Sequence, residues 1–274
     1  MLTDVQLSVI IPVRDAAWCV EKLLISLRTN LSVPHELIIV DNGSRDNTMD
    51  VVLPYADKVI ISDGGVGDCR HRGALASKGT LLLFLDADHQ LLPGTIESAM
   101  DIMRLTSADA IVIPERPARQ TGRLVDRLIF HERRLTEAAG LGIPRFFRRS
   151  VYLEIAGLSS GVVFGEDWRL RSSSHFVKLS EVPLLHSEPL TLRALLYKYL
   201  KYGLRTALIG GSNSKDLGMK ERFRRFTALL MDLSLRQSLI ILPVLAIKVA
   251  KTAAFAFGYC SGRSAFYMRR WCKK

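Results

Sequence analysis

The sequence has few cysteines, and their spacing excludes both a disulfide framework and a zinc-type metal centre. Its 274 residues contain no Cys-x-x-Cys pair, so we expect free thiols in a reducing compartment. Residues 1–6 also lack a basic stretch followed by an apolar one, and no signal peptide is predicted. We therefore expect the main globular part of the chain to face the cytoplasm. The four cysteines are Cys19, Cys69, Cys260 and Cys272.

Acidic residues are scarce in the last third of the chain. Residues 189–274 contain 17 Lys or Arg and three Asp or Glu, whereas residues 1–188 contain 21 and 24, so the net charge of +11 comes from the tail. A basic tail can bind nucleic acid, but this one is strongly apolar and carries no recognisable reader module. No nucleic-acid partner is predicted.

An uninterrupted apolar run long enough to cross a membrane is also missing. The apolar stretches 238–247 and 252–260 are broken by Pro243, Lys248 and Lys251, whereas a spanning helix needs about 20 mostly apolar residues. Apolar stretches with cationic flanks favour an anionic membrane surface. We expect residues 191–274 to form a basic, apolar helical tail that lies in the interface or re-enters it. A true span, and a basic helical subdomain packed on the core, remain open.

The rest of the chain alternates between short apolar runs and segments with helical spacing. This pattern predicts an α/β protein with a doubly wound, mostly parallel sheet. We expect one catalytic domain over residues 1–190, followed by the tail. Expected strands are 5–13, 36–40, 58–62, 80–85 and 110–113, with another starting at 145. Expected helices are 18–30, 47–55, 70–77, 95–105, 123–139 and 190–202.

Two carboxylates, Asp86 and Asp88, directly follow the apolar run 81–85. Such a run is typical of a buried strand, and open α/β sheets bind ligands beyond the carboxyl ends of their strands. Two hard oxygen donors suit Mg²⁺ or Mn²⁺ bridging a diphosphate. Taken alone, the pair could equally be a turn.

Two further residues follow predicted strands. Asp41 could accept hydrogen bonds from a base or a ribose, or could be a turn residue or helix cap. Arg70 is expected to open a helix beside the glycine-rich segment 64–67, which would form an anion site. That segment lacks the third glycine of a dinucleotide fingerprint, and no Lys-Ser/Thr follows it for a phosphate loop.

Candidates for proton transfer and metal binding lie later in the chain. Glu166 and Asp167 could supply a general base, or could cap a helix. His186 ends an apolar segment and could complete a metal shell, or could be a structural histidine.

Together these residues resemble the family 2 glycosyltransferases of the GT-A fold over residues 7–188. The order and spacing of the blocks carry the resemblance. Three departures stand out: His71 where Asn is common, Arg14-Asp15 where an aromatic-Asn pair is frequent, and no acid in residues 156–160. The matching blocks are 7–14, 37–48, 67–73, 84–88, 147–150 and 165–167.

The resemblance implies roles for these residues. Pro12, Val13, Arg14 and Asp41 would line the nucleoside, and Arg70 would bind the diphosphate. Asp86, Ala87 and Asp88 would form the DXD motif, with the metal held by Asp86, Asp88 and His186. Asp167, next to Glu166, would be the catalytic base.

The implied activity is inverting, metal-dependent transfer of a sugar from a UDP- or GDP-sugar. The tail suggests a lipid-linked acceptor, either a polyprenyl phosphate or a growing glycan, at the cytoplasmic face of the membrane. Two alternatives stay open. One is an aspartate-nucleophile phosphatase, although His89-Gln90 is an unusual continuation of its motif. The other is a catalytically degenerate membrane scaffold that only binds nucleotide sugars.

Overall fold

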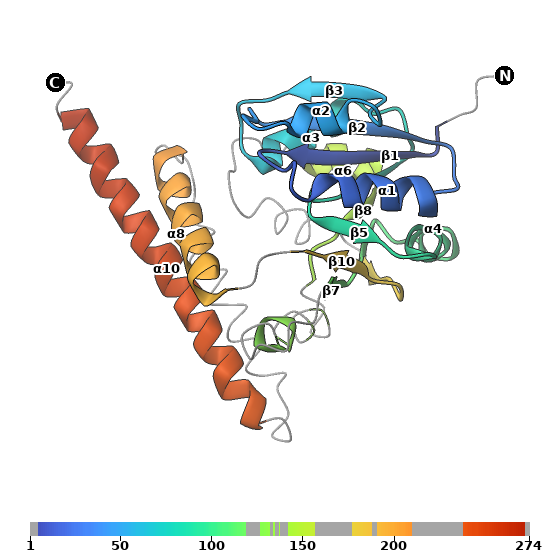
Figure 1. Ribbon diagram of the computed structural model, residues 1–274. Coiled ribbons are helices and arrows are strands. Elements are labelled where there is room, and N and C mark those ends of the chain that lie inside the picture. The colour runs from blue at the N-terminus through green and yellow to red at the C-terminus, as the bar shows by residue number, and fades with distance from the viewer. Residues whose placement is uncertain are drawn as a thin grey trace. The chain divides into compact units, whose positions relative to one another are not determined.

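The computed structural model describes residues 5–118, 127–131, 134, 137, 142–156, 177–187, 191–209 and 238–271. The chain divides into two compact units (Figure 1). The first contains the described residues 5–118, 143–156 and 177–187. The second contains the described parts of 127–142, 191–209 and 238–271.

A seven-stranded sheet forms the centre of the first unit, in the order β3-β2-β1-β4-β8-β6-β9. Strands β3, β2, β1 and β4 are parallel, β8 is antiparallel to both of its neighbours, and β9 is parallel to β6. The predicted α/β architecture with a mostly parallel sheet is therefore confirmed. The strands are β1 Leu7–Val13, β2 His35–Asp41, β3 Lys58–Ile61, β4 Leu81–Phe84, β6 Ala110–Val112, β8 Phe146–Arg148 and β9 Val177–Leu179.

Helices cover both faces of this sheet because strand side chains alternate between the faces. Along β1, Val9 and Ile11 pack with α1 and α4, whereas Ile10 packs with α3 and α6. Helix α3 lies very close to β1 at Gly73, where a Cβ would come within 2.4 Å of the Ile10 Cγ2 atom. The helices of this unit are α1 Val20–Asn30, α2 Thr48–Val52, α3 Val66–Ala76, α4 Thr95–Leu105 and α6 Arg149–Ala156.

A second, three-stranded sheet was not predicted from the sequence. Strand β10 (Leu184–His186) lies in its middle, antiparallel to β5 (His89–Leu91) and parallel to β7 (Glu115–Pro117). The register places His186 opposite His89. Strands of three residues are too short to show an alternating pattern, which explains why the sequence did not reveal them.

The predicted start of the third helix is wrong. Helix α3 begins at Val66, four residues before the predicted start, so Arg70 lies in its second turn rather than at its N-terminus. The glycines at 64, 65 and 67 hid this start, because glycine is a poor helix former. The cysteines of this unit, Cys19 and Cys69, are buried thiols outside any disulfide, as predicted.

The second unit consists mainly of two helices, α8 (Leu192–Ile209) and α10 (Ser238–Trp271). They pack closely, since a Cβ on Gly203 would lie 2.0 Å from the Phe255 carbonyl oxygen, and one on Gly258 would lie 2.1 Å from that of Leu200. The described residues of the predicted 123–139 helix, which are 127–131, 134 and 137, are helical. Among the described helices, none is both long and apolar enough to span a membrane.

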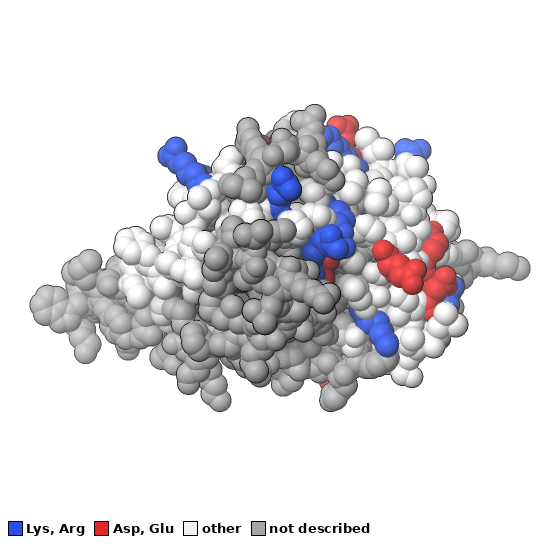
Figure 2. Space-filling view, turned by 90° about the horizontal axis from the view of Figure 1, so that it is seen from below, with Lys and Arg blue, Asp and Glu red and all other residues white. Residues whose placement is uncertain are grey.

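Figure 2 shows one face of the molecule. On it the described Lys and Arg side chains lie in several spots, and described carboxylates are visible at the right and at the upper edge of the view. The described basic side chains therefore do not merge into one broad patch on this face.

Candidate active site

Most of the predicted donor-binding residues lie at or just beyond the carboxyl ends of three neighbouring strands of the large sheet. Parallel pairing aligns Val13 at the end of β1 with Asp41 at the end of β2, and Ile10 with Phe84 of β4. The segments 12–14 and 86–88 and the side chain of Asp41 therefore belong to the same edge of the sheet, where α/β folds bind ligands.

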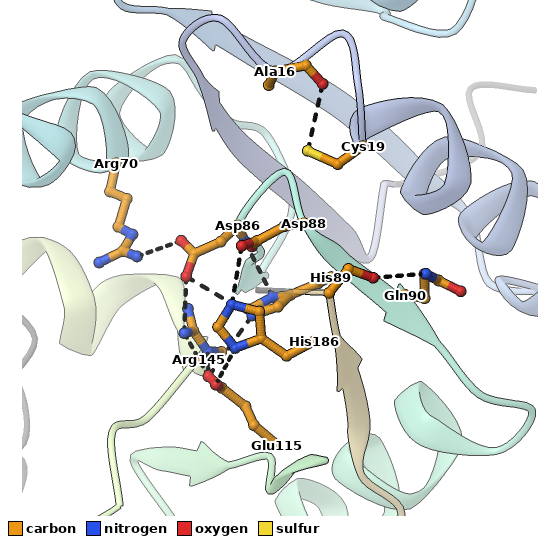
Figure 3. A network of polar contacts seen from close by, with 11 residues as sticks. Ala16, Cys19, Arg70, Asp86, Asp88, His89, Gln90, Glu115, Arg145 and His186 are labelled. Atoms are coloured by element: carbon orange, nitrogen blue, oxygen red, sulfur yellow. Dashed lines mark hydrogen bonds and ion pairs between the residues drawn. The ribbon is translucent and has the colours of Figure 1, made fainter. Parts of the chain in front are cut away.

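Asp86 is held by two arginines. It continues the face of β4 that packs against α3, and the Arg70 Nη2 atom of that helix lies 2.7 Å from Asp86 Oδ1. Arg145, just before β8, brings its Nη2 atom to 2.9 Å from Asp86 Oδ2 (Figure 3). Burial alone would raise the pKa of Asp86, but Arg145 and Arg70 hold it well below its usual range. Asp86 is therefore an anion with both oxygens in ion pairs.

Asp88 points toward a histidine instead. Its Oδ2 atom lies 3.0 Å from Nε2 of His186, and Nδ1 of the same ring lies 2.9 Å from Oε2 of Glu115. Burial opposes a charged imidazole, yet the hydrogen bonds to Asp88 and Glu115 raise the pKa of His186 to about 9. The imidazole thus donates a proton from each nitrogen to a carboxylate.

Glu115 connects the two acids. Its Oε1 atom accepts hydrogen bonds from Arg145 Nε at 2.9 Å and Nη2 at 2.6 Å, while its Oε2 atom faces His186. The sequence analysis missed both Glu115 and Arg145. The one signal for them was indirect, since buried carboxylates at 86 and 88 require buried cations nearby.

His89 lies next to Asp86 and Glu115 and is fully buried. Its Nδ1 atom accepts the backbone N–H of Asp86 at 3.1 Å, so the neutral ring carries its proton on Nε2. Burial lowers the pKa of His89 to about 4, which keeps the ring neutral. Binding a cation at Nε2 would require this proton to move to Nδ1, which already accepts the Asp86 N–H.

A possible metal-binding group nevertheless includes this histidine. Ligand atoms of Asp88, His89 and His186 lie within 4.8 Å of one another. The tautomer of His89 removes it from the donor set. The carboxylate of Asp88 and the imidazole of His186 remain as the best-placed pair for a divalent cation, which would displace the Nε2 proton of His186.

Asp41 is placed differently from the acidic pair. It is almost fully buried, and its Oδ1 atom accepts the backbone N–H of Ser44 at 3.1 Å, which stabilises the turn after β2. Val13 is buried, whereas Arg14 is exposed and precedes Asp15, which has a φ of 48°. The structure therefore brings together Arg70, Asp86, Asp88 and His186, with Asp41 engaged in its own turn.

The predicted base cannot be placed in this network. Glu166 and Asp167 lie outside the described residues, so their roles stay predictions.

Paired carboxylates at the edge of a largely parallel sheet, with arginines and a histidine around them, define a site suited to a phosphate-bearing ligand and a divalent cation. The model of Glycosyl transferase family 2 matches residues 8–156, which is more than half of the chain. The chain therefore belongs to this family and is a glycosyltransferase.

Curated relatives support the same family. An uncharacterized glycosyltransferase of Escherichia coli K12, YibD, is 24% identical over 266 residues, which cover 84% of this chain and 71% of the relative. A PGL/p-HBAD biosynthesis glycosyltransferase of Mycobacterium bovis is 37% identical over 91 residues, or 31% of this chain and 36% of the relative. The match thus spans about a third of the mycobacterial protein.

Solved structures share the fold. S. aureus TarS 1–349 in complex with UDP-GlcNAc has a TM-score of 0.52 at 16% identity, covering 96% of this chain and 92% of that one. Glucosyl-3-phosphoglycerate synthase from Mycobacterium tuberculosis in complex with Mn²⁺, UDP and phosphoglyceric acid has a TM-score of 0.51 at 17% identity, covering 76% and 80%. This likeness confirms the predicted mixed α/β fold of the GT-A type.

Proposed function

We propose that this glycosyltransferase moves a sugar from a UDP- or GDP-sugar to a hydroxyl or phosphate acceptor, with a divalent cation and with inversion. The observation that carries the proposal is the pairing of Asp88 with His186 beside an Asp86 held by two arginines. The solved neighbours in complex with UDP-GlcNAc, or with Mn²⁺ and UDP, lend support at the level of the fold.

The residues present fit a divalent cation. Asp88 offers a carboxylate oxygen and His186 an imidazole nitrogen, a mixed donor set that suits Mn²⁺ and also accommodates Mg²⁺. Asp86 is a poorer ligand than the sequence suggested, because both of its oxygens are engaged by Arg70 and Arg145. A cation bound by Asp88 and His186 would offset negative charge on the departing diphosphate.

The protein's own groups would do the remaining work. Arg70 lies at the edge where a diphosphate would bind, and its guanidinium can hold phosphate oxygens. Segment 12–14 and Asp41 are placed to line the nucleoside. Asp167, with Glu166 beside it, would accept the proton of the acceptor hydroxyl, so that the acceptor attacks in line and the anomeric centre inverts.

A donor screen tests this function. We expect the full chain to hydrolyse or transfer from one member of a panel of UDP- and GDP-sugars in the presence of Mn²⁺ or Mg²⁺. EDTA should abolish this turnover, and Asp167→Asn should lower it at least about 100-fold, as loss of a general base does. The exposed Glu154→Gln is the matched control.

Different outcomes separate the alternatives. Full turnover in EDTA would exclude metal dependence, and full activity of Asp167→Asn would exclude that base. Nucleotide-sugar binding without any turnover would instead support the non-catalytic scaffold. Formation of a phosphoenzyme would support the phosphatase.

We also propose that the acceptor is lipid-linked and that the second unit rests on an anionic membrane at the cytoplasmic face. Helix α8 carries four and α10 five Lys or Arg residues, with no Asp or Glu in either sequence. Ala246, Val249, Ala253 and Phe257 form an exposed apolar stripe at helical spacing along α10. Cations beside an exposed apolar face are typical of helices that lie in a bilayer interface.

A further inference from the structure

One glutamate, Glu115, contacts a partner of each of the two aspartates, Asp86 and Asp88. Glu115 accepts from His186, which faces Asp88, and from Arg145, which holds Asp86. Its side chain is largely buried, with 17% exposed, and the two oxygens have separate tasks. Arg145 holds Oε1 through two nitrogens, which favours the orientation that directs Oε2 toward the histidine ring.

We propose that Glu115 is a positioning residue that prepares His186 to bind the divalent cation. By accepting the Nδ1 proton of His186 at 2.9 Å, it leaves Nε2, the atom nearest Asp88, as the nitrogen that can bind metal. Carboxylates that accept from a metal-binding histidine fix the ring and its tautomer in this way. The proposal rests on the metal dependence proposed above.

The charge of Glu115 matters as well as its shape. A carboxylate can only accept hydrogen bonds, so its two oxygens can accept from Arg145 and from the Nδ1 proton of His186 at the same time. A glutamine at this position has one accepting oxygen and one donating amide. If the glutamine oxygen accepts from Arg145, the amide N–H donates to Nδ1 of His186. The neutral His186 ring then carries its proton on Nε2. That tautomer cannot bind a cation through Nε2.

Titration of the full-length protein with Mn²⁺ alone, followed by calorimetry, tests this role. We expect Glu115→Gln to weaken Mn²⁺ binding about 10- to 100-fold. Glu36→Gln is the matched control, since Glu36 is also a buried glutamate of the first unit but accepts from Ser8 Oγ at 2.6 Å instead. Its dissociation constant for Mn²⁺ should stay at the wild-type value.

A spectroscopic measurement does not depend on the variant folding. In wild-type protein loaded with Mg²⁺, nitrogen NMR of the His186 ring should show the proton on Nδ1. A proton on Nε2, or unchanged Mn²⁺ affinity in a folded Glu115→Gln protein, would overturn the role of Glu115. If wild-type protein binds no Mn²⁺ at all, the proposed metal dependence fails and this role fails with it, so the two results are distinguishable.

Discussion

At the scale of single residues, two aspartates two positions apart have different surroundings. Asp86 forms ion pairs with Arg70 and Arg145, whereas Asp88 contacts His186. The sequence revealed the acids because a buried strand precedes them. It did not reveal Arg145, which is 59 residues away from Asp86, because no local pattern announces a partner from a distant segment.

Removing the charge of Asp86 should destabilise the protein. In Asp86→Asn, two nearly buried guanidinium groups lose their shared carboxylate, and loss of one partner of a buried ion pair costs about 3 kcal/mol or more. Urea unfolding measures this change. Asp101→Asn is the control, because its ion pair with Arg104 is 62% exposed and should contribute less than about 1 kcal/mol. Equal losses in both variants would contradict the prediction.

The metal-free protein should also lose stability in mildly alkaline solution. The pKa of His186 is raised to about 9 from an ordinary value of 6.5, so the folded state holds this proton more tightly than the unfolded state does. The resulting stabilisation is complete below about pH 6.5 and disappears as the pH rises through about 9. Urea midpoints measured in EDTA from pH 6 to 10 test this, with His186→Asn as the comparison. A variant with the same pH dependence as the wild type would disprove it.

At the scale of helices and strands, the sequence predicted those elements that contain a long apolar run or several turns of regularly spaced apolar residues. Strands β1, β2, β3, β4 and β6 and helices α1 and α4 lie within a few residues of their predicted bounds. The sheet that holds His89, Glu115 and His186 was missed, because its three-residue strands are specified by tertiary pairing rather than by local sequence. The part of the site beyond Arg70, the acidic pair and His186 was therefore hidden.

The pairing of α8 with α10 should depend on glycine. Gly203→Leu would place a side chain against the carbonyl oxygen of Phe255, and overpacking of this kind typically costs about 1–3 kcal/mol. We expect faster proteolysis within 191–271, measured by limited digestion and mass spectrometry. Ala253→Leu adds the same side chain at an exposed position of α10 and should leave the digestion rate unchanged. Similar rates for both variants would contradict the prediction.

At the scale of the whole molecule, charge divides along the chain. Residues 1–188 are nearly balanced, whereas the last 86 residues carry 17 Lys or Arg against three Asp or Glu. A balanced catalytic part and a cationic helical part suit an enzyme whose donor is soluble and whose acceptor lies in a membrane. The proposed membrane surface can be tested without knowing the acceptor.

Vesicle binding should depend on the exposed face of α10. Phe257, which is 68% exposed, should insert into the interface, so Phe257→Glu should weaken binding of the full chain to phosphatidylglycerol vesicles about tenfold or more. Binding to phosphatidylcholine vesicles should be weaker, and salt should reduce binding to the anionic ones. Leu105→Glu replaces an apolar residue on α4 that is 84% exposed, and serves as the control. Equal binding of both variants would refute this surface.

The position of β10 in the small sheet has a consequence for biosynthesis. This strand lies between β5 and β7 but is made last, and the contact between Asp88 and His186 joins residues 98 positions apart. While the ribosome is still adding the residues before 184, β5 and β7 have no strand between them and Asp88 has no histidine. The nascent chain can therefore build most of the large sheet early, but the proposed cation site is completed only near the end of the first unit's synthesis.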